Sequence, residues 1–183
     1  MNSLAANRLK GFAIAAIVLV IDLFVKAMVM GPLDLRNRPY GQIELLPFFN
    51  LTYTQNFGVS LGMFTANSAE MRWALVAVTA AIAIVVLVWM LKERRLGDIA
   101  ALALVLGGAL GNIRDRTLYG FVIDYADLHF GEWRPFLIFN IADAAISIGV
   151  VIILARALFL REKPAPELET PHGAPKTPAA ETK

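Results

Sequence analysis

Two aspartates, Asp124 and Asp143, are the residues of this sequence best suited to chemistry. Asp124 lies within FVIDY, and Asp143 lies near the start of the long apolar stretch at 139–160. An apolar setting raises the pKa of a carboxyl group, and two carboxyl groups at short range tend to share a proton. One member can then activate water while the other protonates a leaving group. The same residues could instead cap helices or pair with Arg116, and their spacing alone leaves both interpretations open.

A second candidate for hydrolysis is GVSLG at 58–62, which fits the G-x-S-x-G pattern of a serine nucleophile. That pattern requires a strand, a turn and a helix around Ser60, together with a histidine and an acid. The chain has only His129 and His172, and neither falls in a long apolar stretch. We therefore expect this match to be accidental.

Composition places these candidates in a membrane protein. Of the 183 residues, 57% are hydrophobic and 17% are charged, whereas about 25% are charged in a typical soluble domain. There is no cysteine, which excludes disulfides, thiolate metal sites and cysteine nucleophiles. With only two histidines we expect no metal and no cofactor. The formal net charge is +2 without a long basic patch, so nucleic acid is not an expected partner.

Four apolar stretches are long enough, or nearly so, to cross a bilayer as helices of about 20 residues. They cover 11–30, 73–91, 99–113 and 139–160, and the third needs polar flanking residues to reach this length. Lysines and arginines precede the first stretch, separate the second from the third and follow the fourth. Basic residues favour the cytoplasmic side, so both termini should be cytoplasmic and the connections at 31–70 and 114–136 external.

The remaining segments complete the expected architecture. FFNLTYTQN at 48–56 alternates in polarity and predicts a strand, so we expect a small β element on the outer membrane surface. The stretch at 164–183 is rich in proline, alanine and threonine, which predicts a disordered cytoplasmic tail. The sequence thus predicts an all-α membrane protein, with a four-helix domain at 1–163.

Polar and small residues inside the apolar stretches indicate how the helices pack. Asp22 and Lys26 are four residues apart and share a helix face. We expect them mainly to neutralise each other, with support of an active site as the alternative. GGALG at 107–111 carries the G-x-x-x-G pattern that lets two membrane helices approach closely.

Two functions other than hydrolysis remain open from the residues alone. A small proton-coupled carrier could use Asp22, Lys26 and Asp143 as a relay, although the sequence shows no internal repeat. A non-catalytic scaffold could pack through GGALG, although it would not need two aspartates and two asparagines at one membrane depth.

Four blocks of the sequence closely resemble the lipoprotein signal peptidase family, also called signal peptidase II. They are DLFVK at 22–26, NFGVS at 56–60, GGALGNIRDRTLYGFVIDY at 107–125 and FNIADAAISIG at 139–149. Their order and spacing are similar to those of the family, and the resemblance extends over residues 11–160. Leu61 and Arg114 differ from the residues that the family commonly has at these positions.

The resemblance implies a peptidase of the bacterial inner membrane that has four spanning helices and an active site near the external face. Such enzymes cleave prolipoproteins before a diacylglyceryl-modified cysteine, among membrane lipids, and we expect a monomer. Mapped by motif, Asp124 and Asp143 would be the catalytic pair. The residues expected to bind substrate are Asn56, Asn112, Arg116 and Asn140. The residues expected to support the site are Asp22, Lys26, Gly108 and Asp115.

Overall fold

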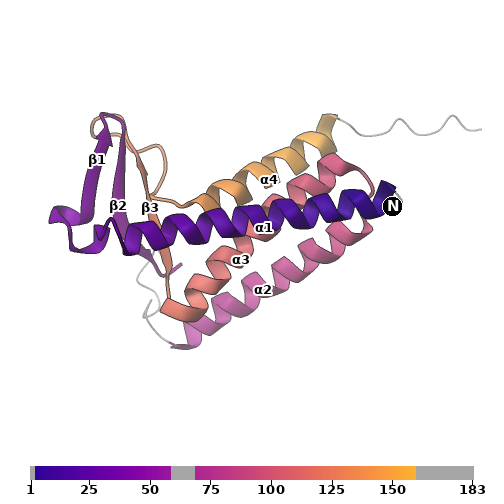
Figure 1. Ribbon diagram of the computed structural model, residues 1–183, viewed down its shortest axis with the longest axis horizontal. Helices are drawn as coiled ribbons and strands as arrows, with labels where there is room; N and C mark the ends of the chain where they lie inside the picture. The colour runs from indigo at the N-terminus through magenta and orange to yellow at the C-terminus, as the bar shows by residue number, and fades with distance from the viewer. Residues whose placement is uncertain (1–2, 59–68, 160–183) are drawn as a thin grey trace, which may run out of the picture.

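The computed structural model describes residues 3–58 and 69–159, which form four long helices with a three-stranded sheet at one end (Figure 1). The helices are α1 (Ser3–Met30), α2 (Ala69–Lys92), α3 (Leu96–Tyr119) and α4 (Ile141–Phe159). Even the shortest, with 19 residues, is about 28 Å long, close to the thickness of the bilayer core. All four are long and apolar enough to cross a membrane. The predicted four-helix membrane fold is confirmed.

Helix α3 is the central helix of the bundle and packs against the other three (Figure 1). In its most apolar 18-residue window 56% of the residues are buried, against 22% in α1, 11% in α2 and 17% in α4. Glycines allow this close packing. A Cβ atom added to Gly107 would overlap the backbone of α1 at Ala15, and one added to Gly108 would overlap the backbone of α4 at Ala142. The close approach predicted from GGALG is confirmed.

The sheet end of α3 extends further than the sequence predicted. Arg114 to Tyr119, which we had placed in the external connection, belong to the last turns of the helix. Hydropathy missed these turns because four of their six residues are polar, and Asp115 among them is buried against Lys26 and β3. The helix stops at Gly120, whose φ of +87° lies in the left-handed region, and the Gly120 N–H bonds the carbonyl of Arg116 at 3.1 Å.

The sheet contains β1 (Gln42–Leu46), β2 (Phe49–Asn56) and β3 (Val122–Leu128), antiparallel and in that order. Two short 3₁₀ turns, Leu35–Asn37 and Pro39–Gly41, connect α1 to β1. Strand β2 confirms the strand predicted at 48–56. Strand β3 was not predicted, and it places Asp124 in the sheet opposite Thr54 of β2, where we expected a loop.

The three basic clusters noted in the sequence, as far as the structure describes them, lie at the end of the bundle away from the sheet, where α1 begins, α2 meets α3 and α4 ends (Figure 1). Arg156 of α4 forms a two-bond ion pair with Asp98 of α3, at 2.5 and 3.1 Å. Asn7 of α1 donates to the carbonyl of Arg94 between α2 and α3 at 3.3 Å. This grouping agrees with the charge pattern, while its cytoplasmic orientation stays a prediction. Ser60, Leu61 and the tail at 164–183 lie outside the described residues.

We expect Gly108→Ala to destabilise the bundle, because its Cβ would meet backbone atoms of α4 that cannot move without separating the helices. The free energy of unfolding in detergent should fall by about 1–3 kcal/mol, despite the higher helix propensity of alanine. Ala81→Leu on the exposed face of α2 is the control and should change little. Unchanged stability of Gly108→Ala would contradict the close packing of α3 on α4.

Candidate active site

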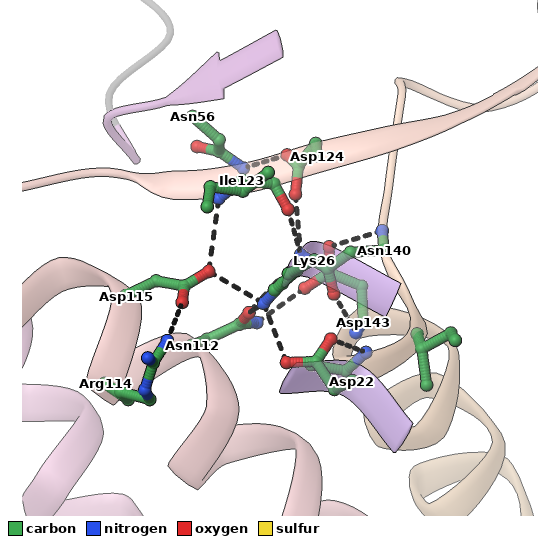
Figure 2. A network of polar contacts seen from close by, with 12 residues as sticks. Asp22, Lys26, Asn56, Asn112, Arg114, Asp115, Ile123, Asp124, Asn140 and Asp143 are labelled. Atoms are coloured by element: carbon green, nitrogen blue, oxygen red, sulfur yellow. Dashed lines mark hydrogen bonds and ion pairs between the residues drawn. The ribbon is translucent and has the colours of Figure 1, made fainter. Parts of the chain in front are cut away.

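Buried polar side chains gather where α1, α3 and α4 meet β3 (Figure 2). They come from four elements that are far apart in the sequence. The set consists of Asp22 and Lys26 of α1, Asn112 and Asp115 of α3, Asp124 of β3, and Asn140 and Asp143 at the start of α4. Because buried charges are costly, each needs a partner in this cluster.

Lys26 lies at the centre of this cluster. Its Nζ is 2.8 Å from Oδ2 of Asp22 and 2.8 Å from Oδ2 of Asp115. It also donates to Oδ1 of Asn112 at 3.3 Å. The predicted pairing of Asp22 with Lys26 is confirmed, but the pair also joins α3, which the sequence did not reveal. An ammonium ion between two carboxylates leaves this triad with a net negative charge.

The two carboxylates that hold Lys26 also hold the backbone. Oδ1 of Asp22 accepts the N–H of Ala142 at 3.1 Å, in the first turn of α4. Oδ2 of Asp115 accepts the N–H of Ile123 at 3.3 Å, in β3. These backbone groups directly precede Asp143 and Asp124 in the sequence. The Lys26 cluster therefore fixes both chain segments that carry the candidate catalytic aspartates.

Asn140 connects the two candidate aspartates. Its Oδ1 accepts the backbone N–H of Asp143 at 2.9 Å, and its own N–H donates to Oδ2 of Asp143 at 3.3 Å. This reciprocal arrangement is a capping box at the start of α4. The Asn140 Nδ2 group donates to Oδ1 of Asp124 at 2.6 Å. Asn140 thus donates to both carboxyl groups, through its side-chain amide to Asp124 and through its backbone N–H to Asp143 (Figure 2).

Two further asparagines direct an amide N–H group at each aspartate. Asn112 accepts from Lys26 through its oxygen and donates through Nδ2 to Oδ1 of Asp143 at 2.8 Å. Asn56 accepts the N–H of Gly58 at 2.8 Å and donates through Nδ2 to Oδ2 of Asp124 at 3.0 Å. In both cases the partner of the amide oxygen fixes which side of the amide faces the carboxyl group.

The two candidate carboxyl groups lie in different environments. Asp124 is 1% exposed, whereas Asp143 is half-buried. Burial, reinforced by the negative charge of Asp143, raises the pKa of Asp124 to about 7. Hydrogen bonds from Asn56 and Asn140 oppose this rise because they stabilise the ionised form. Asp124 can therefore hold a proton near neutral pH, as a general acid must.

A cavity of about 870 Å³ opens beside Asp124. Its lining includes residues 54–58, from β2 and the following turn, and residues 134–138. Arg116 of α3 also lines the cavity, and among the described residues no ion pair joins it to Asp124 or Asp143. A guanidinium group in this position can bind a carbonyl oxygen of an extended peptide.

The predicted site residues come together with few exceptions. Seven of them form the cluster of Figure 2, and Asn56 joins it from β2. Gly108 contacts α4 at Ala142, next to Asp143, and Arg116 lines the cavity without joining the cluster. Arg114, one of the departures from the family pattern, lies 3.4 Å from Asp115 through its Nη1.

Some residues near the site were not predicted. Asp127 and Arg134 form an ion pair beside the cavity, and Thr52 donates to Asp127 at 3.1 Å. The all-buried pattern of β3 hides the polarity alternation that would have marked it as a strand. The ring of His129, which the serine interpretation needs, lies with Nδ1 3.4 Å from the carbonyl oxygen of Asp127, and the backbone N–H of His129 donates to the carbonyl of Phe48 at 3.0 Å.

Similarity to known proteins covers most of the chain. Residues 14–159 match the family described as signal peptidase (SPase) II. The chain belongs to this family. It is 54% identical over 153 residues to a lipoprotein signal peptidase of Sphingopyxis alaskensis, covering 84% of this chain and 87% of the relative. It is 52% identical over 160 residues to one of Rhizorhabdus wittichii, covering 87% and 92%.

Solved structures agree with this assignment. Two structures of a bacterial membrane enzyme obtained by the in meso method are each 29% identical to the chain, with TM-scores of 0.71 and 0.69. The first covers 84% of this chain and 94% of its own, and the second covers 81% and 87%. The signal peptidase II family member described here is therefore a peptidase and a multi-pass membrane protein.

We expect Lys26→Met to destabilise the protein strongly, because it leaves Asp22 and Asp115 buried without their cation. The free energy of unfolding should fall by about 3–5 kcal/mol. Adding Asp115→Asn should recover part of the loss by removing one uncompensated charge. Lys10→Met, at an exposed position of the same helix, is the control for thermal unfolding in detergent. Equal stability of the two lysine variants would argue against a central role of Lys26.

Proposed function

We propose that this peptidase removes the signal peptide from prolipoproteins by cleaving before a diacylglyceryl-modified cysteine, and that it is an aspartic endopeptidase. The main supporting observation is that the carboxyl groups of Asp124 and Asp143 both accept hydrogen bonds from Asn140, one from its side chain and one from its backbone N–H. The Asp124 side chain is buried and Asp143 is half-buried. Family membership supports the substrate, because relatives that are 52% and 54% identical carry the name lipoprotein signal peptidase.

The proposed chemistry divides the work between the two aspartates. Asp143, which is less buried, takes a proton from water as the water oxygen attacks the scissile carbonyl carbon. Protonated Asp124 donates a hydrogen bond to the carbonyl oxygen and later gives its proton to the departing amine. After the C–N bond breaks, the pair again holds one proton, now on Asp143. The two groups share this proton, so the next turnover can begin once it has moved back to Asp124.

The surrounding residues have proposed roles in binding. Arg116 and the amides of Asn56, Asn112 and Asn140 hold the extended substrate backbone and orient the carboxyl groups. Asp22, Lys26 and Asp115 support the site through the backbone bonds described above. No cofactor takes part in this scheme, because the two carboxyl groups supply both the acid and the base.

The location of the site suits a lipid-anchored substrate. We place the protein in the bacterial inner membrane as a monomer, with the sheet at the external face. The acyl chains of a prolipoprotein can then remain among membrane lipids while its peptide reaches the helix ends, where water is available. The described polar cluster lies at one end of the bundle (Figures 1 and 2), which favours hydrolysis over a proton path through the bilayer.

Asp124→Asn and Asp143→Asn should each abolish cleavage, because an amide can neither accept the proton from water nor supply one to the amine. The measurement is a gel-shift assay of purified protein with a diacylglyceryl-modified prolipoprotein, and thermal unfolding should show that both variants still fold. Glu44→Gln, at an exposed position of β1, is the matched control. Full activity of either aspartate variant would refute the mechanism.

The serine interpretation has its own test in the same assay. His129→Ala and Ser60→Ala should both remain active, because neither residue has a part in the proposed chemistry. Loss of cleavage in both variants would restore GVSLG as a candidate nucleophile motif.

The pH dependence of kcat should show a falling limb near pH 7. The raised pKa of Asp124, about 7, means that this acid is protonated below that pH and ionised above it. Activity should therefore decline about tenfold per pH unit on the alkaline side. Asn56→Ala removes a bond that stabilises the ionised form, so the limb should move to higher pH.

Gln55→Ala is the control for this shift, because Gln55 lines the same cavity but donates to Tyr53 rather than to Asp124. A limb that stays in place in Asn56→Ala would show that the titration belongs to another group.

A further inference from the structure

The segment between β3 and α4 doubles back along β3. Phe130 and Trp133 exchange two backbone hydrogen bonds, at 2.8 and 3.3 Å, which close a tight turn. The chain then returns until Phe139 exchanges bonds with Ala126, at 2.8 and 3.1 Å. In Figure 1 this segment lies between the sheet and the start of α4. We call residues 134–138 the return arm.

The return arm forms a wall of the cavity beside Asp124. All five of its residues line the cavity, together with residues 54–58. Two of its apolar side chains have little cover from the protein, since Phe136 is 62% exposed and Leu137 is 84% exposed. Large apolar side chains exposed beside a site usually contact a ligand, a membrane or another protein.

One ion pair fixes the arm to the sheet. Arg134 donates to Asp127 through Nε at 3.0 Å and through Nη2 at 3.4 Å. Asp127 is only 1% exposed, and Thr52 of β2 donates to the same carboxylate at 3.1 Å. A two-bond contact between guanidinium and carboxylate restricts orientation as well as distance. Pro135 follows directly and limits the backbone further.

The ion pair also determines the chemistry of the wall. Arg134 is the only charged residue of the arm, and Asp127 neutralises it. What remains toward the cavity is Pro135, Phe136, Leu137 and Ile138. This surface offers no charge to a ligand and suits an aliphatic group. The other wall supplies polar groups, from Thr54 to Asn56.

We propose that Asp127 and Arg134 are a positioning pair, which holds the return arm as an aliphatic binding wall for substrate beside the scissile bond. This inference rests on the proposed function. The occupant is an aliphatic group of the prolipoprotein, supplied either by an acyl chain or by apolar side chains of the signal peptide. The pair acts on substrate affinity and not on the acid–base step.

Arg134→Ala tests this inference. Release of the arm should raise KM for a diacylglyceryl-modified prolipoprotein about tenfold, the effect of losing a modest apolar contact, and should leave kcat within about twofold. Arg134→Lys keeps the charge without the two-bond geometry, so its KM should lie between those of the parent protein and Arg134→Ala. Arg36→Ala, at an exposed arginine next to the sheet, is the matched control. Leu137→Ala should reproduce the rise in KM, because it removes an apolar side chain from the wall of the cavity. The variant should still fold, because this exposed side chain contributes little to stability.

Whether Arg134→Ala changes KM or kcat distinguishes this positioning role from a purely structural one. Asp127 is on the same strand as Asp124, so a pair that served only to align β3 would lower kcat or move its pH profile. Either result, or unchanged kinetics in Arg134→Ala and Leu137→Ala, would overturn the proposal.

A binding measurement keeps the inference distinct from the proposed function. In the Asp124→Asn background, which should not cleave, Arg134→Ala should weaken binding of a labelled prolipoprotein in nanodiscs about tenfold. Weaker binding without any cleavage by the parent protein would support the wall and count against the peptidase assignment. Unchanged binding would overturn the wall even if the parent protein cleaves.

The source of the aliphatic group follows from two altered substrates. One has shortened acyl chains, and the other has alanine in place of the apolar residues before the cysteine. Each altered substrate should have a higher KM than the unaltered one if the wall contacts the group that was changed. The substrate whose rise in KM disappears in Arg134→Ala identifies that group, because coupled changes are not additive. If both altered substrates still raise KM in Arg134→Ala as much as in the parent protein, the inference is contradicted.

Discussion

The arrangement of the site depends on one buried ammonium group. Lys26 lies within 2.8 Å of both Asp22 and Asp115, and each of these carboxylates accepts a backbone N–H from an element that carries a candidate catalytic aspartate. Without the cation, two negative charges would lie side by side in a medium that solvates them poorly. With it, the carboxylates can bind the start of α4 and the start of β3. Helix packing and the position of both aspartates thus share one electrostatic constraint.

Much of this could be predicted from the sequence, and the exceptions have physical causes. The four helices follow from hydropathy because lipid requires continuous apolar length. The last turns of α3, from Arg114 to Tyr119, were not predicted because they are largely polar, and Asp115 among them is buried against Lys26. Strand β3 was not predicted because it is buried on both faces, so buried and exposed residues do not alternate along it. The link from Lys26 to Asp115 spans elements far apart in the sequence, which no local pattern records.

The candidate site residues were found by motif more than by physical reasoning. Spacing alone left Asp124 and Asp143 open to a role as caps, and Asp143 does take part in a cap, through Asn140. The two interpretations therefore coexist in one residue. A capping box uses the same backbone geometry that presents the Asp143 carboxyl group to its neighbours, so the structural role and the proposed chemical role do not compete.

The inequality of the two aspartates follows from the elements that hold them. Asp124 lies in β3, which pairs with β2 at the end of the bundle, and its burial disfavours the charged form. Asp143 lies in the first turn of a helix, is half-buried and accepts the backbone N–H of Asn140. A sheet placed across helix ends therefore creates two different environments for the same side chain within hydrogen-bonding reach of one asparagine. The sheet supplies the buried position in which, beside the negative charge of Asp143, the Asp124 carboxyl group can keep its proton near neutral pH.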